Sequence, residues 1–194
     1  MKALVIFAHP NPQSYNAAIL DAVKAELGQQ TAEVRVKDLY RMNWNPNLGL
    51  SDLQQIYSGG MPEDIAREQA DIRWADALIL IGPIWWWTLP AIVKGYIDRV
   101  FSYGFAYEFT EKGLRGLMAG KRAIVITTSG ADEKGAAATG MIDAIKTGFI
   151  NAVFGSCGFT PIAYKNCFGV VETSDEVRRH YLEEVKEFVR NNLA

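Results

Sequence analysis

The sequence feature that most constrains the fold of this chain is a set of short, continuous apolar runs separated by segments of helical length. The three clearest runs are residues 3–7, 77–81 and 122–127. Because apolar side chains follow one another in these runs without alternation, we expect strands that are covered on both faces. Strands separated by helix-length segments need right-handed crossover connections, which produce a parallel sheet with helices on both sides.

Weaker patterns complete this alternation of strands and helices. Residues 33–38 alternate polar and apolar side chains, as an outer strand does, and residues 160–168 form the last strand. Helices are expected at residues 14–27, 62–74, 89–101 and 141–154, and from a capping box at 173–176 to the C-terminus. Thr88 is expected to cap the third of these helices, with Pro90 in its first turn.

Residues 41–60 are rich in Asn, Gly and Pro, and we interpret them as an irregular excursion with one helical turn around residues 53–57. The whole order predicts an α/β fold, a doubly wound sheet of five parallel strands in the flavodoxin-like order 2-1-3-4-5. We expect residues 1–194 to form a single domain.

Composition and charge exclude several classes of protein. The net charge is only −2, from 20 basic and 22 acidic residues, so a basic surface for nucleic acid is not expected. The apolar stretch 77–93 is broken by Gly82, Pro83 and Pro90, which leaves it too short to span a membrane. Residues 1–7 are too short for a secretion signal. We therefore expect a cytoplasmic protein without membrane insertion.

The two cysteines, Cys157 and Cys167, have no neighbouring Cys or His at the spacing of metal ligands. They are interpreted as reduced thiols. No metal site is expected.

In a sheet of this order, ligands bind beyond the carboxyl ends of the strands, where the strand order reverses. The first loop at that point is residues 9–16, from His9 to Asn16, and it leads into a helix whose N-terminus can hold an anion. Ser14 adds a hydroxyl donor. The loop carries no dinucleotide or triphosphate glycine motif, so a simple helix cap remains an alternative.

The second loop, residues 82–90, contains Trp85, Trp86 and Trp87 in succession. Three consecutive tryptophans cannot all face a core, so they are expected to cover a planar ligand or a partner chain. The third loop, residues 127–130, has small and hydroxyl side chains that allow close approach of backbone N–H groups, although it can equally be a plain flexible loop. An anion site, an aromatic wall and a wall of N–H donors together fit a flavin mononucleotide moiety.

At these loops the sequence resembles the NAD(P)H:quinone oxidoreductase family, the DT-diaphorase-like flavodoxin fold. The matching stretches are residues 8–9, 14–16, 38–40, 42–43, 45–46, 62–65, 68–69, 83–87, 90–92, 94–95, 99–101, 104–107 and 127–128. They cover most of the first 130 residues in register, whereas the last third matches mainly in layout.

The resemblance implies a two-electron flavoenzyme that is a homodimer with sites at the subunit interface. NAD(P)H would give a hydride to flavin N5, and a quinone, or an azo or nitro aromatic compound, would then take it in a ping-pong cycle. The residues that the resemblance places on the flavin are His9, Ser14, Tyr15 and Asn16 at its phosphate side, Pro83, Ile84, Trp85, Trp86 and Trp87 at its ring, and Thr127, Thr128, Ser129 and Gly130 at its polar edge. It also implies that Tyr107, as a catalytic residue, and Phe109 line the substrate pocket from the partner subunit.

The chain departs from the family pattern at two places. The tyrosine and histidine that follow the third loop in well-known members are absent from residues 131–140, so we expect backbone N–H groups with Lys134 to stabilise charge on the reduced ring. An insertion that holds the adenosine half of FAD is also absent, although Arg178 aligns with a residue used near that half. The choice between FMN and FAD stays open.

Three other functions remain alternatives at this stage. A flavodoxin-type electron carrier is usually strongly acidic, which a net charge of −2 supports weakly. A regulatory subunit of a potassium-efflux transporter is a second alternative, because the family that the sequence resembles includes bacterial ancillary oxidoreductases of such transporters. No docking peptide is evident in the sequence. A phosphotransfer receiver would need an acidic residue at the end of the first or third strand, and neither has one.

Overall fold

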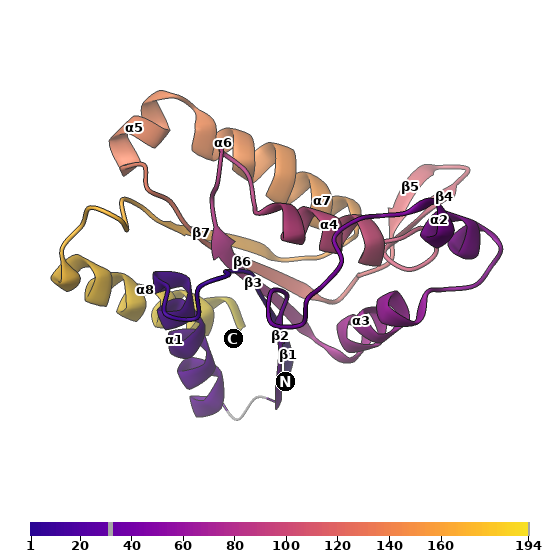
Figure 1. The fold of residues 1–194 in the computed structure, drawn as a ribbon, viewed down its shortest axis with the longest axis horizontal. Coiled ribbons are helices and arrows are strands. Elements are labelled where there is room, and N and C mark those ends of the chain that lie inside the picture. The colour runs from indigo at the N-terminus through magenta and orange to yellow at the C-terminus, as the bar shows by residue number, and fades with distance from the viewer. Residues whose placement is uncertain (31–32, 194) are drawn as a thin grey trace.

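The computed structural model describes residues 1–30 and 33–193, and its centre is a five-stranded parallel sheet in the order β2-β1-β3-β6-β7 (Figure 1). The strands are β1 (Lys2–Phe7), β2 (Glu33–Asp38), β3 (Ala77–Pro83), β6 (Arg122–Thr128) and β7 (Ile162–Cys167). Numbered among the sheet strands alone, this is the order 2-1-3-4-5. The predicted fold class is therefore confirmed.

The sheet separates two apolar cores, which explains why its central strands are continuously apolar. Leu4 and Ile6 of β1 face a core shared with α3 (Glu63–Trp74) and α4 (Ala91–Val100). Val5 and its neighbours on the other face pack against α1 (Tyr15–Gln29) and α8 (Asp175–Leu193). Successive side chains of a strand point to opposite faces, so a strand covered on both sides has no solvent-facing position to fill with a polar residue.

Three segments differ from the prediction. The excursion at residues 41–60 contains a helix of two turns, α2 (Leu50–Tyr57), where one turn was expected. A short antiparallel hairpin, β4 (Tyr107–Thr110) and β5 (Gly113–Gly116), was not predicted. The loop after β6 contains α5 (Glu133–Ala138).

The helix expected at residues 141–154 consists of α6 (Met141–Ile145), the π-helical turn η1 (Lys146–Asn151) and α7 (Ala152–Ser156).

Two predicted helix caps were wrong by one or two positions. Pro90, and not Thr88, occupies the N-cap position of α4, because the Thr88 N–H and C=O groups are both hydrogen-bonded to Trp85 in a tight turn. At α8 the hydroxyl that accepts a helical N–H is that of Ser174, from Val177 at 3.3 Å, and not that of Thr173.

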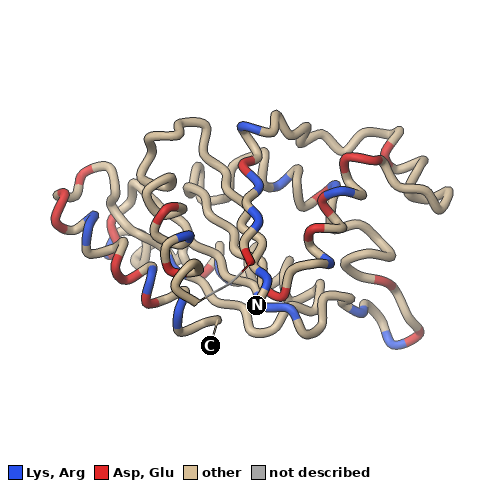
Figure 2. The backbone as a smooth tube through the Cα atoms, turned by 90° about the horizontal axis from the view of Figure 1, so that it is seen from below, with Lys and Arg blue, Asp and Glu red and all other residues tan. Residues whose placement is uncertain are grey.

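Acidic and basic positions are interspersed along the chain, most visibly on α8 (Figure 2). Within residues 1–30 and 33–193, none of the helices combines the length and the apolar character needed to cross a membrane.

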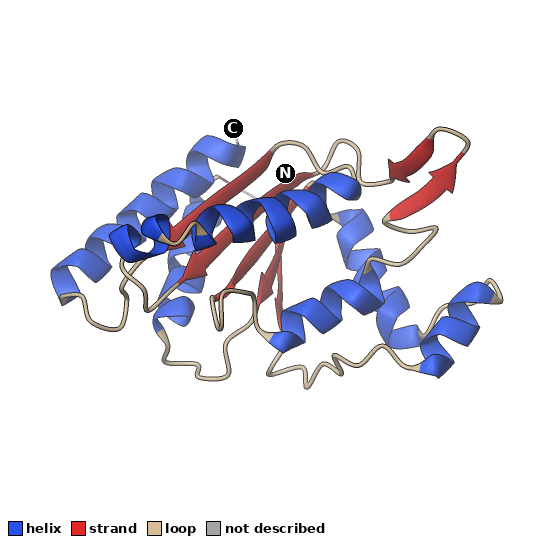
Figure 3. Ribbon diagram, turned by 90° about the horizontal axis from the view of Figure 1, so that it is seen from above, coloured by secondary structure: helices blue, strands red, loops and turns tan. Residues whose placement is uncertain are grey.

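The β4–β5 hairpin projects from the end of the molecule opposite to the arrowheads of the sheet strands (Figure 3). The loops that follow the strand ends and the hairpin are therefore far apart within one chain.

Candidate ligand site at the carboxyl edge of the sheet

The three loops singled out in the sequence meet in one pocket of about 420 Å³ at the carboxyl ends of β1, β3 and β6. The pocket is lined by His9, Ser14, Tyr15, Asn16, Pro83, Ile84, Trp85, Thr128, Ser129, Gly130, Val170 and Val171. Ten of these twelve were expected to bind a cofactor. The topology brings them together because parallel strands end at the same edge of the sheet.

The first wall is the N-terminus of α1. Ser14 is its N-cap, and the Ser14 hydroxyl accepts the Ala17 N–H at 3.2 Å. Within the described chain, the N–H groups of Tyr15 and Asn16 have no acceptor, as is usual for the first turn of a helix. They supply the unpaired donors and the positive end of the helix dipole that favour an anion.

Asn16 gives this wall a second, independent feature. Its side chain is only 3% exposed, and Nδ2 donates to Thr128 Oγ1 at 2.9 Å. The other amide atom, Oδ1, is buried and has no partner among the described residues. A buried polar atom without a partner costs free energy, so a hydrogen-bonding ligand in this pocket would remove that cost.

The second wall ends in a tight turn that displays the tryptophans. The Trp85 N–H donates to Thr88 O at 2.9 Å, and the Thr88 N–H donates back to Trp85 O at 3.2 Å. The two residues between them, Trp86 and Trp87, have φ angles of 50° and 60°. Trp85 lies edge-on to the His9 ring, with centroids 5.9 Å apart.

Trp86 and Trp87 themselves do not line the pocket of the chain. The Trp86 side chain is 95% exposed and Trp87 is also exposed. The prediction that the three tryptophans cannot all enter a core is consistent with this arrangement.

The third wall is the end of β6 and the residues after it. Thr128, Ser129 and Gly130 line the pocket, but Thr127 is fully buried behind them. The Thr127 hydroxyl bonds to Asn166 Oδ1 at 2.7 Å and to the Tyr164 hydroxyl at 3.0 Å, both from β7. The Thr127 side chain therefore lies behind the pocket wall, bonded to β7, and does not line the pocket.

A fourth wall, which the sequence did not indicate, is formed by Val170 and Val171 in the loop after β7. Two backbone bonds attach this loop to the third wall, from Gly169 N–H to Ala131 O at 2.9 Å and from Val170 N–H to Ser129 O at 3.1 Å. The only available signal was its position after the fifth strand, because valines have no chemistry that marks a site.

Arg178 of α8 supports the fourth wall from behind. Its Nη1 donates to Val170 O at 3.0 Å and its Nη2 pairs with Asp175 at 2.6 Å. The Tyr15 hydroxyl donates to the Arg178 carbonyl at 2.5 Å, and burial raises the pKa of that phenol well above its usual value. Tyr15 is therefore neutral, and Arg178 lies behind the pocket lining, bonded to Tyr15 and to Val170.

The remaining predicted residues lie outside the pocket of the chain. Lys134 is exposed on α5, and the pocket lining does not include it. Tyr107 and Phe109 belong to the β4–β5 hairpin, where they pack with Tyr103 into an aromatic cluster.

Both cysteines are buried thiols. Burial raises the pKa of Cys157 to about 11 and that of Cys167 to about 12, so neither is ionised near neutral pH. They are not candidates for a nucleophile.

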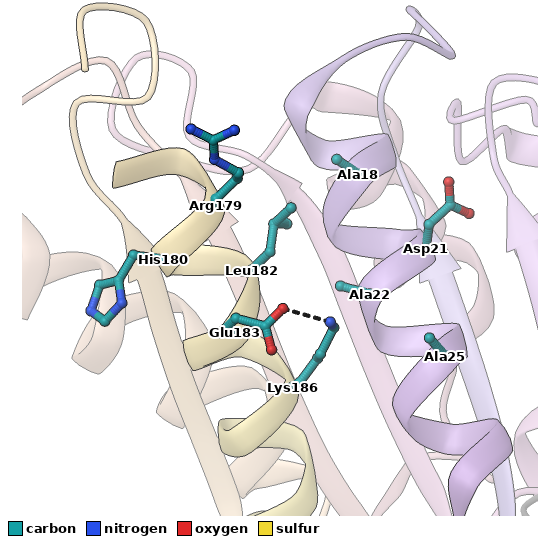
Figure 4. Close-up of a pocket in the computed structure, with 9 residues that line it drawn as sticks. All are labelled: Ala18, Asp21, Ala22, Ala25, Arg179, His180, Leu182, Glu183 and Lys186. Carbon is teal, nitrogen blue, oxygen red and sulfur yellow. Dashed lines mark hydrogen bonds and ion pairs between the residues drawn. The ribbon is translucent and has the colours of Figure 1, made fainter. Parts of the chain in front are cut away.

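A larger hollow of about 630 Å³ lies between α1 and α8 (Figure 4). Its α1 side is formed by Ala18, Ala22 and Ala25, and an ion pair of 2.7 Å joins Glu183 to Lys186 across its α8 side. The small alanine side chains explain the hollow. It contains no convergent set of polar groups comparable with those at the strand ends.

The residues of the strand-end pocket fit a flavin mononucleotide moiety. Free helix N–H groups suit the phosphate, the unpaired Asn16 Oδ1 suits a ribityl hydroxyl, and Pro83, Ile84 and Trp85 offer an apolar wall to a ring. Fold and site together define a flavodoxin-like protein with a pocket for an anionic, planar ligand.

The particular family follows from comparison with known proteins. A sequence-family profile described as the flavodoxin-like fold matches residues 1–189, and the chain belongs to that family. A Haemophilus influenzae protein described as an uncharacterized NAD(P)H oxidoreductase is 36% identical over 187 residues, which is 95% of this chain and 92% of that protein. Human ribosyldihydronicotinamide dehydrogenase (quinone) is 30% identical and covers 92% of this chain and 86% of its own length.

Among solved structures, an NAD(P)H:quinone oxidoreductase from Methanothermobacter marburgensis superimposes with a TM-score of 0.89 at 31% identity, over 98% of this chain and 96% of its own. These relatives confirm the resemblance to NAD(P)H:quinone oxidoreductases that the sequence motifs indicated.

Proposed function

We propose that this protein is a flavin-dependent NAD(P)H:quinone oxidoreductase that works by a ping-pong cycle. When bound, the flavin would supply the redox chemistry, as acceptor of a hydride from NAD(P)H and donor of a hydride to a quinone. The class of activity, an oxidoreductase, is that of the relatives named above. The observation that carries the proposal is the pocket at the strand ends, where free helix N–H groups and a buried, unpaired amide oxygen of Asn16 face an apolar wall.

Each wall of the pocket has one task in this proposal. Ser14 and the N–H groups of Tyr15 and Asn16 bind the phosphate at the N-terminus of α1. Pro83 to Trp85 bind one face of the ring and exclude water from it, with Trp86 and Trp87 added when a partner or a substrate covers them. The N–H groups of Gly130 and Ala131 stabilise negative charge at the polar edge, because donors fixed in advance need no reorganisation when charge develops.

Of the two flavins that the sequence left open, we propose FMN as the cofactor. The guanidinium of Arg178, which aligns with a residue near the adenosine half of FAD, is already engaged with Asp175 and Val170 O. Mass measurement of the released cofactor distinguishes FMN from FAD.

The second half of the substrate pocket is proposed to come from a second copy of the chain. Tyr107 and Phe109 lie on the hairpin, away from the pocket of their own chain, and Phe109 is 66% exposed. Exposed aromatic side chains that stack on one another typically mark an interface. In a homodimer, this cluster could cover the ring of the partner and contact the quinone.

The test is direct. The purified protein should be yellow, release about one flavin per chain, and oxidise NADPH with a quinone without any added reductase. A colourless protein that takes up no flavin on reconstitution would overturn the proposal. Flavin binding without quinone turnover would indicate an electron carrier instead. We also infer a cytoplasmic location, where NAD(P)H is available and buried thiols such as Cys157 stay reduced.

A further inference from the structure

A network of buried hydrogen bonds lies behind the third wall of the pocket, and none of the roles assigned above uses it. It joins Tyr164, Thr127, Asn166, Ser129 and the carbonyl of Ala131. Thr127, Ser129 and Asn166 are each at least 91% buried. Polar groups are kept in such places only when each has a partner, so the arrangement is a built feature of the fold.

The side-chain amide of Asn166 fixes the direction of donation in this hydrogen-bond network. Asn166 Nδ2 donates to Ser129 Oγ at 2.9 Å, which leaves Asn166 Oδ1 to accept from Thr127 Oγ1 at 2.7 Å. The single proton of Thr127 is thereby used, so its oxygen accepts from the Tyr164 hydroxyl at 3.0 Å. The proton of Ser129 goes to Ala131 O at 3.1 Å.

Asn166 therefore holds the wall at two points, one on each side of Thr128. Thr128 itself is held by Asn16 from the opposite face of the sheet, at 2.9 Å. Beyond Ser129, within the described chain, the N–H groups of Gly130 and Ala131 have no acceptor. The three residues before these unpaired donors, Thr127 to Ser129, each have a hydrogen-bonded hydroxyl group.

The geometry points to Asn166 as a positioning residue for hydride transfer: it holds Thr127 and Ser129 so that the N–H donors of residues 130–131 stay directed at the charged edge of the reduced flavin. This inference rests on the proposed function. Asn166 is buried and does not line the pocket, so in this inference it acts through Thr127 and Ser129. A fixed donor favours the ligand form with more negative charge, so losing the support should weaken binding of reduced flavin more than binding of oxidised flavin.

The experiment compares Asn166→Leu with a matched variant, Tyr164→Phe. Leucine has the same branched outline as asparagine, although it is bulkier, and it cannot bond to Thr127 or Ser129. Tyr164→Phe removes only the hydrogen bond between Tyr164 and Thr127 and leaves both bonds of Asn166 intact. The dissociation constants of oxidised and chemically reduced FMN for the apo-protein are measured by fluorescence and absorbance titration, and the reduction potential of the bound flavin is measured independently.

For Asn166→Leu we expect the ratio of the two dissociation constants, reduced over oxidised, to rise about tenfold, equivalent to about 30 mV for a two-electron couple. Tyr164→Phe should change the ratio less than twofold. Equal weakening of both redox forms in Asn166→Leu, or no weakening of either, would overturn the inference. If Asn166→Leu does not fold, Ser129→Ala removes one of the two bonds of Asn166 and should show a smaller loss that is still selective for reduced flavin.

The wild-type titration separates this inference from the proposed function. A wild-type protein that binds no flavin contradicts the proposed function. A wild-type protein that binds flavin beside an Asn166→Leu variant with an unchanged ratio contradicts only the role of Asn166.

Discussion

Trp86 and Trp87 occupy the two central positions of a turn that glycine and asparagine ordinarily fill. Both have positive φ angles, 50° and 60°, and such a conformation costs a residue with a Cβ about 1–2 kcal/mol. Because the Trp86 side chain is 95% exposed, no packing compensates for that cost within one chain. Strain that persists in this way is typical of functional loops.

We therefore expect Trp86→Asn to stabilise the flavin-free protein, by about 0.5–1 kcal/mol, because asparagine tolerates positive φ far better than tryptophan. The same change should lower quinone turnover by removing part of the aromatic wall. Urea unfolding of the apo-protein and steady-state kinetics measure the two effects.

Tyr57→Asn is the matched control for this prediction. Tyr57 is an exposed aromatic residue, at 78%, without a positive φ angle. Its replacement should not stabilise the protein. A Trp86→Asn protein that is less stable than the control would contradict the strain argument.

The sequence predicts that Lys134 stabilises charge on the reduced ring, whereas the structure places this residue outside the pocket lining. It is exposed and lies outside the pocket lining, so its charge acts on the ring edge only through solvent. We expect Lys134→Ala to slow flavin reduction by NADPH about two- to threefold in stopped-flow measurements. An unchanged rate would leave the backbone donors alone in this role, whereas a fall of tenfold or more would place the ammonium at the ring.

The sequence located three of the four pocket walls because their position follows from strand order, and strand order follows from apolar runs. The fourth wall, Val170 and Val171, could not be found in this way. Its place depends on two backbone bonds to residues 129 and 131, and any side chain can supply a backbone bond. The side-chain bond between Thr127 and Asn166 could not be predicted for a different reason, because it depends on the register between β6 and β7.

At the scale of elements, the excursion around α2 is held to the body of the protein by one buried guanidinium. Arg99 of α4 bonds to Asp52 at 2.8 Å and to Asp64 at 2.6 Å, and it lies over the Trp44 ring at 4.9 Å. The hydrogen bond from Arg99 lowers the pKa of Asp52 below its usual value. We call these contacts of Arg99 with Asp52 and Asp64 the Arg99 clasp; they join α2 and α3 to α4.

Arg99→Met should destabilise the protein by about 3 kcal/mol at neutral pH, because it leaves the largely buried carboxylate of Asp52 without its partner. A carboxyl whose pKa is lowered on folding stabilises the fold above its unfolded pKa of about 3.9, and this contribution is lost as the pH falls through the folded value. The difference between wild type and variant should therefore shrink below about pH 4. Thermal unfolding at several pH values measures it, and a difference that grows on acidification would contradict the clasp.

The segment before α2 also packs closely on α4, at Gly95. A Cβ at Gly95 would lie 2.1 Å from Pro46 O, closer than any real contact. We expect Gly95→Ala to destabilise the protein by about 1–3 kcal/mol through overpacking. Gly28→Ala in α1 is the matched control, because a Cβ there meets nothing within 4 Å and alanine favours helix. Chemical denaturation should give opposite signs for the two variants, and equal signs would contradict the packing argument.

The elements that the sequence missed share a physical cause. Strands β4 and β5 have four residues each and form a two-stranded sheet apart from the central one, so no apolar run marks them. The extra turn of α2 carries no fully buried residue, and the clasp through Arg99 holds it in place. Local pattern predicts elements that bury a continuous face, whereas these depend on contacts made elsewhere in the chain.

At the scale of the whole molecule, one chain carries the two parts of the proposed quinone site at opposite ends. The flavin-type pocket lies at the carboxyl ends of the sheet strands, and the aromatic hairpin lies at the other end (Figure 3). Two copies related by a twofold axis can place the hairpin of each over the pocket of the other, because a twofold interface pairs the same surfaces reciprocally. We therefore expect the proposed activity to depend on a dimer.

Phe109→Lys tests this requirement with little effect on folding, because the Phe109 side chain is 66% exposed in the single chain. Wild type should sediment at twice the mass of one chain, and the variant should shift toward one chain mass, since a buried unpaired charge at an interface is costly. Quinone turnover should fall at least tenfold while the melting temperature of the isolated chain stays within a few degrees. Val36→Lys is the control: Val36 is an exposed apolar residue of edge strand β2, away from the hairpin, so its variant should remain dimeric and active. A monomeric wild type with full turnover would show that one chain suffices, and the aromatic cluster would then need another explanation.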